Sequence, residues 1–193
     1  MSTAAVFFAD GFEMIEALSP VDYMRRAGIE VVTVAVVSGA EDKRIVRSSH
    51  GVSMFADMTF DGWIDSRGGR LPDAVVCPGG SSGAENLGAD GRLLRYIEEC
   101  NAAGKVVAAI CASPAVVLGK TTVLAGRKWT CYPGMQDRAS GFGGGYSDLP
   151  VVVDGNVVTA RGAGASEEFA MELVGILAGA DAAARIKKGT CQR

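Results

Sequence analysis

One cysteine, Cys111, occupies a position typical of a nucleophile. In the segment VVAAICASPAVVLG (residues 106–119) an apolar run ends, the cysteine follows, and a helical pattern begins within about two residues. A nucleophile elbow of this kind lifts the side chain out of the sheet. The amides of the following helix carry partial positive charge, which favours an acidic, reactive thiol. The pattern taken alone fits a buried structural cysteine equally well.

Two further segments are candidates to complete a site around this thiol. Glu16 follows the first apolar run and has apolar neighbours, so its carboxyl is expected to hold a proton and donate a hydrogen bond. An exposed helical glutamate is the commoner outcome of such a pattern. Gly79 and Gly80 follow another apolar run, where glycine lets the backbone approach a ligand. A simple turn is the alternative for this pair.

Other segments carry weaker signals. The run Gly141–Gly145 is not a phosphate loop, because no strand precedes it and no Lys-Ser or Lys-Thr pair follows it, so a flexible connection is expected. His50 is expected to lie in a loop. The four remaining cysteines lack an elbow and are expected to be structural or merely exposed: Cys77, Cys100, Cys131 and Cys191.

A parallel sheet is the element that brings these residues together. Apolar runs at residues 4–9, 30–37, 74–77 and 106–110 predict strands, and hairpins are expected over 46–59 and 151–159. Helical patterns cover residues 15–27, 93–103, 113–118, 166–178 and 180–187. Pro20 either kinks the first helix or marks a later start at Ser19, and Ser166 is expected to cap its own helix. The alternation predicts an α/β fold with helices on both faces and the site at the carboxyl ends of the strands.

The composition is that of one globular domain spanning residues 1–193. Apolar residues make up 48% and charged residues 21% of the chain, and the net charge of −3 does not favour nucleic-acid binding. No apolar run approaches the roughly 18 residues of a membrane span. The five cysteines are odd in number and form no CxxC pair, so a cytoplasmic location is expected. With one histidine, no metal site is expected.

Four segments together resemble the ThiJ/PfpI superfamily, in the branch of the parkinsonism-associated protein deglycase. They read GFEMIEALSPVDYMRRAGIEV, PGGSSGAENL, AAICASP and ARGAGASEEFAMELV, and they follow the family's order over nearly the whole chain. The resemblance implies a flavodoxin-like fold, a homodimer and no cofactor. It places Cys111 at the family's elbow cysteine and Glu16 at its partner glutamate. It also places Gly80 and Ala112 where backbone amides form a small anion pocket, with Gly79 beside them.

One position departs from the family's pattern. Family enzymes often carry a histidine in the segment that reads WTCYPG here, and Tyr132 stands in that place. A Cys-His hydrolase arrangement would then need His50 to reach the site, which counts against a peptidase. By resemblance, Arg26 and His50 correspond to positions near the dimer-side wall of the pocket.

Two functions fit these residues. The first is a cofactor-independent glyoxalase or deglycase, a hydro-lyase or hydrolase. In it Cys111 adds to methylglyoxal or its adducts, Glu16 moves protons, and the Gly80 and Ala112 amides hold the oxyanion. The second is an oxidative-stress sensor and redox chaperone, in which Cys111 is oxidised to a sulfinate that Glu16 hydrogen-bonds. The expected partner is accordingly a small aldehyde or a damaged protein. The elbow and the glutamate serve both functions, while Tyr132 slightly favours sensing.

Overall fold

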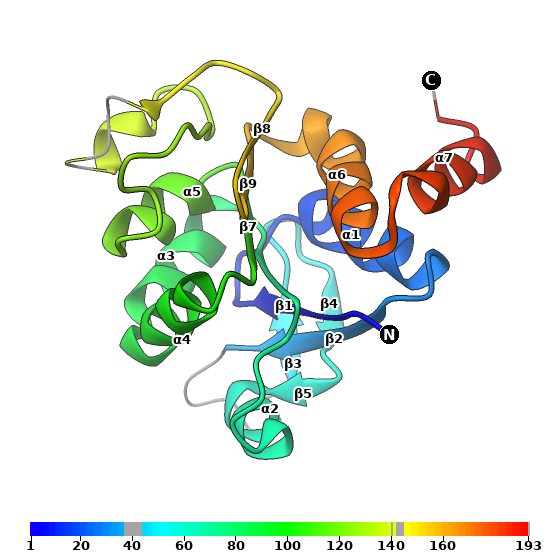
Figure 1. Ribbon diagram of the computed structural model, residues 1–193. Helices are drawn as coiled ribbons and strands as arrows, with labels where there is room; N and C mark the ends of the chain where they lie inside the picture. Colours follow the sequence, from blue (N-terminus) through cyan, green and yellow to red (C-terminus); the bar gives the residue numbers. More distant parts are fainter. Residues whose placement is uncertain (37–43, 140, 142–144, 193) are drawn as a thin grey trace.

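A mostly parallel sheet of seven strands forms the centre of the molecule (Figure 1). The structure is a computed structural model, and it describes residues 1–36, 44–139, 141 and 145–192. The strand order is β5-β2-β1-β6-β7-β9-β8, and within the described residues only β8 runs antiparallel. The strands are β1 (Thr3–Phe8), β2 (Glu30–Ala35), β5 (Met58–Thr59), β6 (Ala74–Cys77), β7 (Val106–Ile110), β8 (Val151–Asp154) and β9 (Val157–Ala160).

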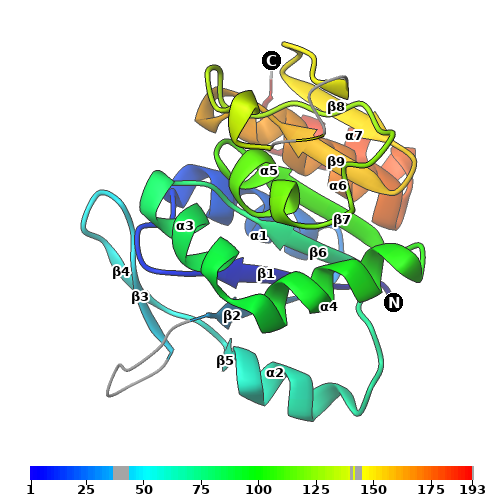
Figure 2. The ribbon, with the colours of Figure 1, turned by 90° about the vertical axis from the view of Figure 1, so that its left-hand side faces the viewer.

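Helices cover both faces of this sheet (Figure 2). One face packs against α1 (Met14–Arg26), α6 (Ser166–Ala178) and α7 (Ala180–Gly189). The other packs against α2 (Phe60–Arg67), α3 (Ser81–Ala89), α4 (Gly91–Ala102) and α5 (Ser113–Val116). Along β1 the side chains alternate between the two cores, with Phe7 in one and Phe8 in the other. The predicted flavodoxin-like α/β class is confirmed.

The smaller elements join these layers. Strands β3 (Ile45–Arg47) and β4 (Ser53–Phe55) form a separate antiparallel hairpin. Short 3₁₀ turns lie at Leu118–Lys120, Gln136–Arg138 and Ala163–Ala165. Among the residues the structure describes, no helix is both long and apolar enough to cross a membrane.

Four local expectations are corrected. Helix α1 begins at Met14 and continues through Pro20, so it does not start at Ser19. Ser166 does not cap α6, because Ala165 is the cap residue and the buried Ser166 hydroxyl has no hydrogen-bond partner. The hairpin predicted over 46–59 ends at Phe55, since Met58–Thr59 pairs with β2 instead. Strand β2 ends at Ala35; residue 37 lies outside the described residues, as does most of the 141–145 loop.

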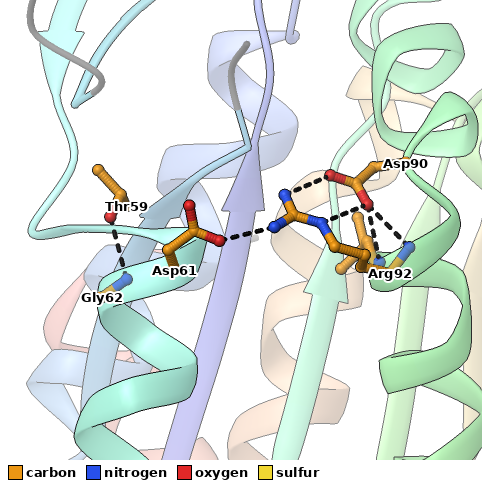
Figure 3. Close-up of polar contacts among 6 residues, drawn as sticks. Thr59, Asp61, Gly62, Asp90 and Arg92 are labelled. Carbon is orange, nitrogen blue, oxygen red and sulfur yellow. Dashed lines mark hydrogen bonds and ion pairs between the residues drawn. The ribbon is translucent and has the colours of Figure 1, made fainter.

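Two helices, α2 and α3, were not expected from the sequence. The start of α2 is fixed by Thr59, whose Oγ1 accepts a hydrogen bond from the Gly62 amide at 3.1 Å. Figure 3 shows how α2 is tied to α4, because the Arg92 guanidinium contacts Asp61 at 2.7 Å and Asp90 at 3.1 Å. Asp90 in turn caps α4 by accepting from the Arg92 amide at 2.8 Å. Helix α3 is rich in glycine and serine, which obscured its pattern.

The strand order places the ends of β1, β6 and β7 side by side. Strand β1 lies between β2 and β6, and β6 lies beside β7, all parallel. The chain passes from β1 to β2 on one side of β1, and later returns to β6 on its other side. The direction in which strands are added to the sheet therefore reverses at β1. In open α/β sheets ligands bind beyond the carboxyl ends of the strands at such a reversal. The turns after β1, β6 and β7 therefore meet at one edge.

Candidate functional site

Cys111 sits on a strained turn directly after β7. Its φ of 65° lies in the left-handed region, which costs a non-glycine residue roughly 1–2 kcal/mol. Two backbone hydrogen bonds hold the turn: the Cys111 amide donates to Ala160 O at 2.8 Å, and the Tyr132 amide donates to Cys111 O at 2.7 Å. The side chain is partly exposed, whereas every residue of β7 before it is buried. The sharp strand-to-helix turn predicted at this cysteine is confirmed.

Glu16 lies in the first turn of α1 with its side chain enclosed. The residue is only 1% exposed, and its Oε2 accepts a hydrogen bond from the Gly79 amide at 3.0 Å. A second hydrogen bond joins its carboxyl to Cys111. Burial raises the pKa of Glu16 from its ordinary 4.5 to about 7, with a smaller contribution from the charge of Glu13 and opposition from the two hydrogen bonds. The burial of Glu16 predicted from its apolar neighbours is confirmed, and its role as a proton donor stays a prediction.

The thiol of Cys111 is less acidic than the sequence indicated. Burial and the adjacent charge of Glu16 raise the pKa of Cys111 to about 12, while hydrogen bonds from the Gly80 and Ala112 amides act in the opposite direction. Helix α5 has only four residues, so its dipole does not outweigh burial. The expectation of an acidic thiol is wrong. Glu16, titrating near neutrality, is instead placed to accept the thiol proton when the sulfur reacts.

Gly79 and Gly80 allow α1, β6 and β7 to approach one another closely. A Cβ on Gly79 would lie 2.5 Å from Cys111 Cβ and 2.5 Å from Glu16 Oε2. Gly80 has a φ of 85°, and a Cβ there would meet the Glu13 amide nitrogen at 2.7 Å. These glycines do more than form a turn. A side chain at Gly79 would separate the thiol from the carboxyl, and one at Gly80 would collide with the backbone just before α1.

Cys111 and Glu16 open into a cavity of about 480 Å³ at this edge of the sheet. The sequence-predicted residues Gly80, Ala112, Tyr132 and His50 line it. Arg26 does not, because it lies in the last turn of α1 and pairs with Asp22 at 2.7 Å. The full lining comprises Glu13, Glu16, Ser49, His50, Gly80, Ser81, Cys111, Ala112, Tyr132, Pro133, Gly134, Met135 and Ala163.

The rim of this cavity contains a polar cluster that sequence reasoning missed. Ser49 Oγ donates to Glu13 Oε2 at 2.9 Å, and His50 Nδ1 lies 3.0 Å from Ser49 Oγ and 3.3 Å from Glu13 Oε2. The contacts described for His50 do not include Cys111, and its side chain is 72% exposed. His50 thus reaches the pocket without forming a Cys-His pair. No local pattern marked Glu13, because it is the extended residue before α1 and its contact with Ser49 depends on the fold.

The described part of the chain has no group of three or more His, Cys, Asp or Glu side chains placed to hold a metal ion. What the site offers is a thiol, a carboxyl titrating near neutrality and two backbone amides aimed at the sulfur. These groups suit nucleophilic addition to a carbonyl, and they also suit stabilisation of an oxidised sulfur.

Comparison with known proteins places this site in a family. The chain matches the sequence model of the DJ-1/PfpI family over residues 2–175. It belongs to the DJ-1/PfpI family. The Parkinson disease protein 7 homolog of Danio rerio is 38% identical over 185 residues, covering 95% of this chain and 94% of that protein. A deglycase from Pyrococcus abyssi is 30% identical over 172 residues, covering 89% and 97%.

A solved structure of the DJ-1/PfpI family has the same fold as this chain. Oxidized DJ-1 of Toxoplasma gondii superposes with a TM-score of 0.88 at 35% identity, covering 99% of this chain and 98% of that one. The superfamily predicted from the four segments is confirmed. The relatives include proteins named DJ-1 and one named deglycase, and those names leave open which activity this chain has.

We expect iodoacetamide to distinguish the five cysteines of this DJ-1/PfpI protein by accessibility. Cys77, Cys100 and Cys131 are fully buried, and burial raises the pKa of each to about 12. Cys111 and Cys191 are the two with exposed surface. Native labelling read by peptide mass should therefore modify these two alone, and unfolding in urea should release the other three. Native labelling of Cys77 or Cys100 would contradict the packing described here.

The raised pKa of Glu16 also makes a prediction about stability. Between pH 4.5 and about 7 the folded protein holds a proton that the unfolded chain has released, so the free energy of unfolding falls as pH rises through this window. The shift corresponds to roughly 3 kcal/mol. Urea unfolding at pH 5 and 7.5 should show this loss in the wild type but not in Glu16→Gln. Equal pH dependence in the two proteins would contradict it.

Proposed function

We propose that this protein is a cofactor-independent glyoxalase or deglycase that acts on methylglyoxal or its adducts. The observation that carries the proposal is the Cys111–Glu16 pair, in which a buried carboxyl with a pKa of about 7 contacts a thiol facing a cavity. A general base works best when its pKa lies near the operating pH. The name of the Pyrococcus abyssi relative supports the same assignment.

The first step is addition of the Cys111 sulfur to the aldehyde carbon of methylglyoxal. The S–C bond forms as the thiol proton moves to Glu16 and the carbonyl electron pair moves to oxygen. The Gly80 and Ala112 amides, which donate to the sulfur in the free protein, are near enough to stabilise the oxyanion. Return of a proton to that oxygen gives a hemithioacetal.

The later steps need only proton transfer and water. Glu16 removes the hydrogen from the former aldehyde carbon, giving an enediol, and a proton returned to the neighbouring carbon converts this to a lactoyl thioester. Water then attacks the thioester carbon, lactate leaves, and the thiol is restored. The sum is methylglyoxal plus water giving lactic acid, in which one carbon is oxidised and its neighbour reduced, so no external oxidant is required.

The second candidate function is oxidative-stress sensing through a Cys111 sulfinate. The structure of oxidized DJ-1 from Toxoplasma gondii favours it, because that relative shares the fold over nearly its whole length. A protonated Glu16 would donate a hydrogen bond to a sulfinate oxygen. In this function, turnover of aldehydes would be incidental.

Two measurements on wild type and Cys111→Ser separate the functions. They are lactate formed from methylglyoxal, assayed enzymatically, and Cys111 sulfinate formed under limited peroxide, assayed by peptide mass. A glyoxalase gives lactate only with the wild type. Wild type that forms sulfinate and yields no more lactate than Cys111→Ser would overturn the enzyme assignment in favour of sensing.

We further propose that the protein is a homodimer, as the resemblance implied. Exposed apolar side chains lie on α1, where Ile15 is 56% exposed, and on the β3–β4 hairpin, where Phe55 is 64% exposed. The hairpin region is joined to the start of α1 by a hydrogen bond from the Ser49 amide to Phe12 O at 2.9 Å. A partner docked on this face would cover both segments.

Light scattering at micromolar concentration should therefore give twice the 19.9 kDa chain mass. Phe55→Glu should reduce the mass toward that of one chain, because a charge would be buried in the interface. Ile176→Glu is the matched control on α6, where Ile176 is 45% exposed. A monomeric wild type, or equal effects of the two substitutions, would contradict this arrangement.

A further inference from the structure

One peptide unit joins the start of α5 to the glutamate of the site. The hydroxyl of Ser113, the first residue of α5, donates to Pro78 O at 2.6 Å. The amide that follows this carbonyl is that of Gly79, and it donates to Glu16 Oε2 at 3.0 Å. Because a trans peptide is planar and its C=O and N–H point in opposite directions, the orientation of one group fixes that of the other. Ser113 therefore holds the peptide whose amide is aimed at Glu16.

The four residues of this connection are enclosed within one chain. Ser113 is 0% exposed, Glu16 is 1% exposed, and Pro78 and Gly79 are buried. In the described part of the chain no backbone amide donates to Pro78 O, so the serine hydroxyl is what satisfies this carbonyl. A partner docked on α1 and the β3–β4 hairpin would cover the molecular surface and leave these internal contacts in place.

The Gly79 amide acts on the charge of Glu16. A donor stabilises the ionised carboxylate, so this hydrogen bond lowers the pKa of Glu16 against the larger effect of burial. A hydrogen bond accepted by a peptide carbonyl also strengthens the donor at the other end of the same peptide. Among the described residues, the titratable groups that act on Glu16 are Cys111, on the turn after β7, and Glu13, just before α1. The hairpin residue His50 contacts Glu13 instead, and the turn after β6 and the start of α5 contribute uncharged groups.

We propose that Ser113 is a positioning residue, which acts through the Pro78–Gly79 peptide to set how readily Glu16 releases and regains its proton. Ser113 lies two residues after Cys111, so the start of α5 fixes both the thiol and the donor to the carboxyl. The inference deepens the proposed function and rests on it for any effect on turnover. Its effect on Glu16 exists equally if the protein is only a sensor.

Titration of the Glu16 carboxyl by NMR tests this role without requiring turnover. Protein labelled with carbon-13 at the glutamate carboxyl carbons is titrated from about pH 5 to 9, and the Glu16 resonance is the one absent from Glu16→Gln. We expect Ser113→Ala and Ser113→Gly, which lack the donor, to raise the midpoint by about 0.5 or more, because a hydrogen bond to a charged group is weakened. Ser113→Thr, which keeps the hydroxyl, should stay near the wild-type midpoint of about 7.

Thr121→Val is the matched control for a merely structural role. The buried Thr121 hydroxyl donates to Leu118 O at 2.7 Å, so this variant also loses a hydroxyl-to-carbonyl hydrogen bond, and Thr121 does not line the pocket. Both Thr121→Val and Ser113→Ala should lower the free energy of unfolding in urea, but only Ser113→Ala should move the Glu16 midpoint. An unmoved midpoint in Ser113→Ala, an equal shift in Thr121→Val, or a Ser113→Thr midpoint equal to that of Ser113→Ala would overturn the proposal.

The pH profile of kcat/KM for methylglyoxal is the second readout. Glu16 must be ionised to accept a proton, so activity rises with pH through its midpoint. Ser113→Ala should therefore lower kcat/KM by about threefold or more at pH 6, with a smaller loss at pH 9. Wild type without turnover, together with a shifted midpoint in Ser113→Ala, would overturn the proposed enzymatic function and leave the role of Ser113 standing. Strong wild-type turnover with an unmoved midpoint would overturn the role of Ser113 alone.

Discussion

Glu16→Gln is expected to lower methylglyoxal turnover by about 100-fold or more, while Cys111 reacts with iodoacetamide at least as fast as in the wild type. Glutamine preserves the volume of the side chain and its contact with the Gly79 amide, but it cannot accept and return a proton. The charge of Glu16 is one of the causes that raise the pKa of Cys111, so its removal lowers that pKa and increases the thiolate fraction. Reactivity of the thiol and turnover should therefore change in opposite directions.

Glu16→Leu distinguishes proton transfer from packing. Leucine also removes the acceptor of the Gly79 amide, which is then buried without a partner at a cost of about 1–3 kcal/mol. We expect both Glu16→Leu and Glu16→Gln to lose turnover of methylglyoxal. The free energy of unfolding should fall in Glu16→Leu but not in Glu16→Gln. Lactate release, alkylation rate and urea unfolding are the three measurements. If Glu16→Leu matched the wild type in all three measurements, Glu16 would not be the partner of Cys111.

Gly79→Ala is expected to damage stability and the site together. The new methyl group would lie 2.5 Å from both Cys111 Cβ and Glu16 Oε2, and Ile110 O is 2.9 Å away. None of these neighbours is the free end of a flexible surface chain. Overpacking of this kind costs about 1–3 kcal/mol, and displacement of two reacting groups by an ångström lowers turnover by about 100-fold.

Gly175→Ala is the matched control for this substitution. Gly175 lies within α6 and no heavy atom lies within 4 Å of the position its Cβ would take. Alanine should stabilise that helix by about 0.5–1 kcal/mol and leave turnover unchanged. Thermal unfolding and lactate release test both variants. A Gly79→Ala protein with wild-type stability and turnover would show that the close approach of β6 to Cys111 is not required.

The sequence predicted the parts of the fold whose signals are local. The apolar runs that became β6 and β7 needed no knowledge of their neighbours, because strands buried on both faces are apolar throughout. Helix α3 was missed because Ser81–Ala89 contains few strong helix formers and is held by its packing. Ser166 looked like a cap by residue type, but a capping residue needs a non-helical backbone, and Ser166 itself is helical with φ −62° and ψ −37°.

Only those parts of the site that are marked by a local sequence pattern were predicted. The elbow at Cys111 and the apolar surroundings of Glu16 can both be identified along the chain. The raised pKa of Cys111 could not, because it arises from burial and from a carboxyl that lies far from it in the sequence. Ser49 and His50 were not placed with Glu13 for the same reason, since a hairpin brings them to the start of α1.

The close packing around Gly79 and Gly80 means that some pocket positions tolerate no substitution, whereas others do. The floor is backbone from three turns, and no side chain larger than hydrogen fits at either glycine. Other parts of the lining are side chains, including Tyr132, which is 52% exposed, and Met135. Evolution or design that alters which aldehyde is accepted must therefore act on these side chains and on the rim, leaving the reacting pair as a constant unit.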